Sequence, residues 1–127
     1  MPSRIVELKA VEELDVVLAQ SSSRPMLLFK HSPTCGTSAQ AHEEVESLVD
    51  EGSVPADVYL ISVRASRAVS NAVAERFNLR HESPQVLLVR QGVMRWNASH
   101  FSVTAARIRA ALRALAPGAP VPSAPAP

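Results

Sequence analysis

The chain has 127 residues, 46% of them hydrophobic, which is enough to bury the core of one domain. Its 13 Lys and Arg nearly balance 12 Asp and Glu, giving a formal net charge of +1, so a partner selected by bulk charge, such as nucleic acid or an anionic membrane, is not expected. The N-terminus lacks the apolar core of a signal peptide and no stretch approaches the ~18 apolar residues of a membrane span, so we expect a cytoplasmic protein.

Strands and helices are predicted to alternate along the chain, which then ends in a hairpin and a helix. Short apolar runs indicate strands, and apolar residues at every third or fourth position indicate helices. Gly92 can take the positive φ of a tight turn, so the last two strands should be antiparallel. This order predicts a three-layer α/β sandwich with a mixed sheet of four to five strands. The predicted strands are 4–8 (at an edge), 26–30, 57–63, 86–89 and 93–98, and the predicted helices span 11–20, 35–51, 66–77 and 104–115.

Single residues predict the helix ends, and a proline-rich stretch predicts the domain boundary. Ser66 and Thr104 are predicted N-terminal caps, and Gly52 is well placed to end the second helix. Residues 117–127 contain Pro at five of eleven positions and no large residue to bury. We therefore expect one domain over residues 1–116 and an extended, disordered tail.

Cys35 is the only cysteine, so any disulfide that it forms must be with another molecule. It lies between the apolar run 26–30 and the second helix, where the unpaired N–H groups of a first helical turn would favour a thiolate. A lone cysteine is more often a small buried side chain, but this setting favours a nucleophile. Its polar neighbours indicate an accessible, substrate-binding position; they are Thr34, Gly36 and Thr37.

Two further features converge on the cysteine. Ser38 completes the pattern "CGTS", and its hydroxyl could reach back one turn and donate a hydrogen bond to the thiolate, which would lower the pKa further. Ser83-Pro84 directly precedes a predicted strand, where a cis proline in a tight turn is expected. The backbone edge of this segment could pair with an extended peptide or a small peptide-like thiol. Cys35 and Ser38 are thus the predicted catalytic residues.

The histidines give a weaker signal. His31 and His42 flank the cysteine and could tune it, but neither has metal-ligand spacing, so no metal site is predicted. His81 is expected at the surface or in loop packing, and His100 follows the hairpin, from which it could approach the site.

Three sequence blocks in fixed order, "FKHSxTC", "RHESPQVLL" and "WNASHF", resemble the YtxJ-like monothiol bacilliredoxins, a branch of the thioredoxin-like fold. The resemblance runs from about Ile5 to Leu115. It implies a thiol-disulfide oxidoreductase that removes bacillithiol, or a similar small thiol, from mixed disulfides with client proteins. Cys35 would then be the attacking cysteine, Pro84 the cis proline beside it, and Ser38 the residue at the position of a second cysteine in dithiol relatives. We also expect a monomer with no bound cofactor and with the small thiol as co-substrate.

Gly36 departs from this family, which usually has Pro directly after the cysteine. It also makes "CGTS" similar to the "CGFS" of monothiol glutaredoxins, which hold a shared iron–sulfur cluster with glutathione. An iron–sulfur carrier is therefore one alternative. A non-catalytic binding module of thioredoxin-like fold, with Cys35 as a passive or regulatory thiol, is the other.

Overall fold

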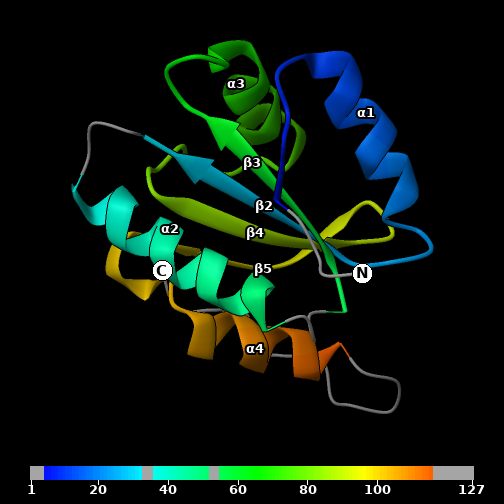
Figure 1. Ribbon diagram of the computed structural model, residues 1–127. Coiled ribbons are helices and arrows are strands. Elements are labelled where there is room, and N and C mark those ends of the chain that lie inside the picture. Colours follow the sequence, from blue (N-terminus) through cyan, green and yellow to red (C-terminus); the bar gives the residue numbers. More distant parts are fainter. Residues whose placement is uncertain (1–4, 33–35, 52–54, 116–127) are drawn as a thin grey trace.

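Five strands form one mixed sheet in the order β1-β3-β2-β4-β5 (Figure 1). The computed structural model describes residues 5–32, 36–51 and 55–115. Strands β1 and β2 run parallel to β3, whereas β4 is antiparallel to β2 and β5 to β4. The strands are β1 (Ile5–Glu7), β2 (Met26–His31), β3 (Asp57–Ser62), β4 (Gln85–Arg90) and β5 (Val93–Ser99). The helices are α1 (Val11–Gln20), α2 (Gly36–Asp50), α3 (Arg67–Arg76) and α4 (Ala105–Ala114), with a short 3₁₀ turn η1 (His100–Ser102) before α4.

Helices cover both faces of the sheet, which confirms the predicted three-layer α/β/α sandwich. Helices α1 and α3 lie on one face, and α2 and α4 on the other (Figure 1). Successive side chains of β2 divide between the two cores: Leu27 and Phe29 pack under α2 and α4, Met26 and Leu28 under α1 and α3. A central strand covered on both faces must be apolar throughout, which explains the run "MLLF".

Most predicted boundaries agree with the structure to within one or two residues. Thr104 caps α4 by accepting a hydrogen bond from the Arg107 backbone N–H at 3.2 Å. Gly92 has φ of 74° in the β4–β5 turn, as predicted. Ser66 occupies the cap position of α3, but its side chain makes no capping bond, so that part of the prediction was wrong. The Ser66 backbone carbonyl instead accepts from Val69 and Ser70.

Several predictions fall outside the described residues. These are the helix end at Gly52, the tail at 117–127, and the positions of Thr34 and Cys35.

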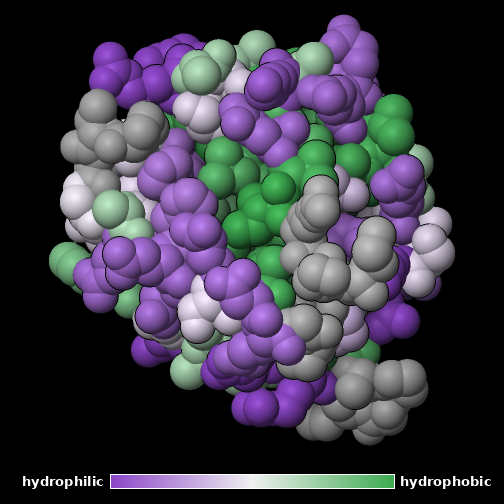
Figure 2. Space-filling model, viewed as in Figure 1, coloured by the Kyte–Doolittle hydropathy of each residue, from purple (hydrophilic) through white to green (hydrophobic). Residues whose placement is uncertain are grey.

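The face of the molecule seen in Figure 2 has separate hydrophilic and apolar regions. A hydrophilic band follows α2, and apolar side chains reach the surface between α2 and α1 (Figure 2). Within the described residues, no helix combines the length and apolar character that crossing a bilayer requires.

Candidate active site

The predicted site residues that the structure describes gather where β2 ends, α2 begins and the chain enters β4; they are Gly36, Thr37, Ser38, Ser83 and Pro84. Strand β2 ends at His31, and the residue directly after Cys35, Gly36, is the first residue of α2. The parallel neighbour β3 ends at the same edge of the sheet. This arrangement places the first turn of α2, which favours negative charge, at the carboxyl end of the central strand.

Ser38 is fully buried and connects two separate segments of the chain. Its Oγ accepts a hydrogen bond from the backbone N–H of Ser32 at 3.3 Å and lies 3.5 Å from the Oγ of Ser83. A hydroxyl has one proton and two acceptor positions. When Ser83 donates, both acceptor positions of Ser38 are occupied and its proton is free to be donated elsewhere. Two predicted site residues, 45 positions apart in sequence, therefore meet.

The Ser83–Pro84 peptide bond is cis, as predicted from the position of this pair before a strand. Pro84 is buried, and its carbonyl accepts a hydrogen bond from the backbone N–H of His100 at 2.9 Å. The next residue, Gln85, begins β4 and pairs with Lys30 of β2. The segment is thus held between the central strand and η1.

The first turn of α2 has one exposed residue and one residue that lines a small hollow. Gly36 is exposed, and a Cβ added to it would meet nothing within 4 Å. Thr37 is half-buried and, with Gln40, lines a small hollow whose other side is formed by His100 and Phe101 of η1. Phe101 is 77% exposed, which is unusual for so large an apolar side chain.

A pair of histidines lies beside this turn. The rings of His31 and His42 are 4.8 Å apart, and each packs against Phe29. Burial lowers the pKa of His31, and repulsion from His42 lowers it further, while the Ser38 backbone opposes the change. His31 is therefore neutral at pH 7. Within the described residues, no three His, Asp or Glu side chains converge in a way that could hold a metal ion.

Sequence reasoning missed a buried lysine under the site. Lys30 is fully buried on the α3 side of the sheet, with its Nζ 3.3 Å from Nδ1 of His81. The same Nδ1 lies 3.4 Å from Oγ of Ser70 in α3. Burial lowers the pKa of Lys30 to about 8. The available signal was a lysine that directly continues the apolar run of a strand covered on both faces.

His100 lies at the site, in the position that the sequence suggested. Its Nε2 is 2.8 Å from a carboxylate oxygen of Glu82, and this hydrogen bond lowers the pKa of Glu82. Glu82 directly precedes Ser83, so the contact ties the proline segment to η1 through side chains as well as through the backbone.

The chain matches the model of one protein family, Monothiol bacilliredoxin BrxC, over residues 6–108. It therefore belongs to the monothiol bacilliredoxin family. The predicted resemblance is confirmed over most of the domain.

Solved structures agree on the fold. A candidate oxidoreductase with a thioredoxin fold superposes with a TM-score of 0.77 and 27% identity, covering 84% of this chain and 92% of its own. Thioredoxin from Fasciola hepatica superposes with a TM-score of 0.70 and 14% identity, covering 86% of this chain and 97% of its own. Thioredoxin O2 from Arabidopsis thaliana superposes with a TM-score of 0.68 and 19% identity, covering 91% of this chain and 96% of its own. The fold is thioredoxin-like, and family and fold together support a thiol oxidoreductase.

Proposed function

We propose that this chain removes bacillithiol, or a similar small thiol, from mixed disulfides with client proteins, using Cys35 as its nucleophile. The observation that carries the proposal is the buried Ser38, hydrogen-bonded between Ser32 and Ser83 in the first turn of the helix that follows Cys35. A hydroxyl in this position can donate to a thiolate at the helix start.

The reaction is a thiol–disulfide exchange without an external oxidant. The Cys35 thiolate attacks the sulfur of the small thiol, a new S–S bond forms, and the client sulfur leaves with the electron pair of the broken bond. A second small thiol, as thiolate, then attacks the Cys35 adduct and releases Cys35 as a thiolate. The first helical turn and the Ser38 hydroxyl raise the thiolate fraction of Cys35 and make it a better leaving group in the second step.

Ser83 and Pro84 border the cysteine in this proposal. Thr37, which lines the hollow beside His100, and the exposed Gly36 would contact the departing client or the small thiol. Thr34 is proposed to do so on the basis of sequence alone. We propose a cytoplasmic monomer with no metal or tightly bound cofactor, because the exchange needs only the co-substrate.

The test uses one protein carrying either bacillithiol or glutathione in a mixed disulfide. Wild type should release the small thiol and accumulate a single adduct at Cys35, detected by mass spectrometry. Cys35→Ser should release none. If Cys35→Ser acts as fast as wild type, the proposal is wrong, and if it still binds clients, the binding module is favoured. A coloured dimer after anaerobic reconstitution with iron, sulfide and a small thiol would favour the iron–sulfur carrier.

Ser38→Ala should lower the exchange rate at pH 7 and recover most of it near pH 9, because loss of a donor raises the thiol pKa. Ser47→Ala is the matched control, since Ser47 is an exposed serine on the same helix. Equal losses at both pH values would contradict a role in thiolate stabilisation.

A further inference from the structure

A pocket of about 710 Å³ lies beside the proline segment and has no role in the proposed exchange so far. Glu82 and Gln85, which flank Ser83-Pro84, form one wall, while β5, η1 and Arg107 of α4 form the others. The volume falls within the range of small-molecule sites, about 300–1,000 Å³. Two of the three sequence blocks that carry the family resemblance, around residues 80–85 and 96–100, supply most of its lining.

His100 joins this pocket to the candidate active site. It lines the pocket and also the hollow formed by Thr37 and Gln40 in the first turns of α2. Its backbone N–H donates to the Pro84 carbonyl at 2.9 Å. A molecule with one end at Thr37 and Pro84 could therefore place its other end in the pocket.

The charged side chains of the pocket favour an anion. Arg107 is exposed and forms no ion pair with any described residue. Arg80 is 91% exposed and approaches only Glu82, at 3.8 Å. Glu82 is the single carboxylate, and it already shares a 2.8 Å contact with His100. Arg107 is therefore available, and Arg80 is held only by its 3.8 Å ion pair with Glu82 on an exposed side chain. Guanidinium groups bind carboxylates in a bidentate geometry.

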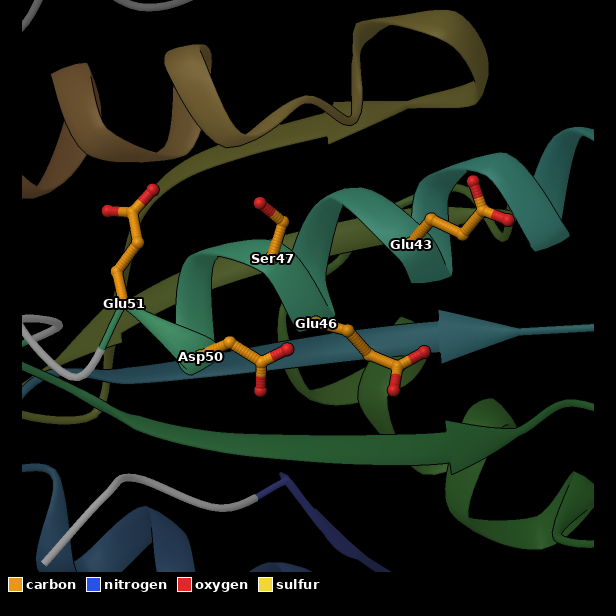
Figure 3. A pocket seen from close by; sticks show the side chains of 5 residues that line it. All are labelled: Glu43, Glu46, Ser47, Asp50 and Glu51. Atoms are coloured by element: carbon orange, nitrogen blue, oxygen red, sulfur yellow. The ribbon is translucent and has the colours of Figure 1, made fainter.

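A cluster of carboxylates farther along α2 would repel the same ligand. Figure 3 labels Glu43, Glu46, Ser47 and Asp50 of α2 and Glu51 directly after it. These residues line an open hollow of about 520 Å³. Glu51 pairs with Arg109 and Glu46 with His42, which leaves Glu43 and Asp50 without an ion pair among the described residues. An anionic small molecule is therefore directed away from this face and toward Arg80 and Arg107.

We propose that the pocket lined by Arg80, Asn97 and Arg107 binds the non-thiol part of a carboxylate-bearing small thiol while its sulfur reacts. This proposal rests on the proposed thiol exchange, which it deepens by naming the ligand class. Arg80 and Arg107 bind the carboxylates, Asn97 and Ser102 offer hydrogen bonds, and the half-buried Trp96 supplies an apolar wall. Bacillithiol and glutathione both carry two carboxylates, so both belong to the class.

Kinetics with three mixed disulfides of one test protein provide the first measurement. The double variant Arg80→Ala, Arg107→Ala should raise KM about tenfold for bacillithiol or glutathione adducts, as loss of a charge-assisted contact predicts, with kcat nearly unchanged. The neutral 2-mercaptoethanol adduct should react at the wild-type rate. Arg113→Ala, an exposed arginine of α4 outside the pocket, is the matched control. An equal loss for the neutral adduct would overturn the proposal.

Binding without turnover separates this proposal from the exchange reaction itself. Trp96 is the only tryptophan of the chain and lines the pocket, so its fluorescence reports occupancy. S-methyl bacillithiol and S-methylglutathione, which cannot exchange, should change that signal in wild type and not in the double variant, and the tighter ligand identifies the source. Absence of any change in wild type would refute the pocket even if exchange proceeds. A change without exchange would retain the pocket and refute the proposed function.

Discussion

Replacing Lys30 with Met should make the protein more stable, and only below a defined pH. Lys30 is fully buried, and its Nζ has one neighbour within hydrogen-bond distance, Nδ1 of His81, among the described residues. No described carboxylate pairs with it. Methionine has a similar length and flexibility, so it can fill the same space without a charge. Ser70 would still lie within reach of His81 in the variant.

The expected gain follows from the pKa of Lys30. Burial lowers this pKa from 10.5 to about 8, which corresponds to roughly 3 kcal/mol against the charged form. Loss of the hydrogen bond to His81 offsets about 1 kcal/mol of this. At pH 7 the variant should therefore unfold with a free energy about 2 kcal/mol higher than wild type.

The pH dependence gives the sharper test. Between pH 8 and 10.5 the unfolded chain keeps a proton on Lys30 that the folded chain has lost, so wild-type stability rises with pH in this window. The difference between Lys30→Met and wild type should be constant below pH 8 and shrink steadily above it. Urea unfolding of both proteins from pH 7.5 to 10 measures this difference, above the range in which His81, whose pKa the Lys30 charge lowers, takes up a proton. A difference that stays constant to pH 10 would refute a buried, charged lysine.

Three further predictions concern the first turn of α2 and the histidines beside it. Gly36→Ala should raise the free energy of unfolding by about 0.5–1 kcal/mol, because the added methyl meets open space and restricts the unfolded chain; chemical denaturation at pH 7 would show a loss if the space were occupied. Ser38→Ala should cost about 1 kcal/mol beyond Ser47→Ala in the same measurement, because the Ser32 N–H loses an acceptor; equal costs would contradict the buried contact. The free energy of unfolding should fall as pH drops below 6.5, because folding lowers the pKa of His31 and the unfolded chain therefore binds a proton that the folded chain resists. The variant His31→Gln should show a smaller fall. An unchanged pH dependence in this variant would contradict the role of His31.

The sequence predicted the strands and helices around the site better than the side-chain contacts within it. Periodicity places β2 and α2 correctly because both bury apolar side chains. Ser83-Pro84 stands out because a proline in a tight turn before a strand is where a cis bond is expected. The contact between Ser38 and Ser83 depends on how β2 pairs with β4, which no local pattern encodes. The Arg80–Arg107 pocket is likewise assembled by tertiary packing from distant segments.

The single cysteine connects the pocket to both steps of the proposed exchange. Because Ser38 cannot supply a second sulfur, the adduct on Cys35 must be discharged by a thiol from solution. In the proposed cycle both half-reactions pass through the same disulfide between Cys35 and the small thiol, so the same carboxylates would occupy the pocket twice. Removing Arg80 and Arg107 should therefore raise KM for the client mixed disulfide, whereas KM for the free small thiol should change little, because that thiol attacks an adduct whose own carboxylates already occupy the pocket. A similar rise in both KM values, measured by stopped-flow with each substrate separately, would contradict an adduct that keeps the pocket occupied during discharge.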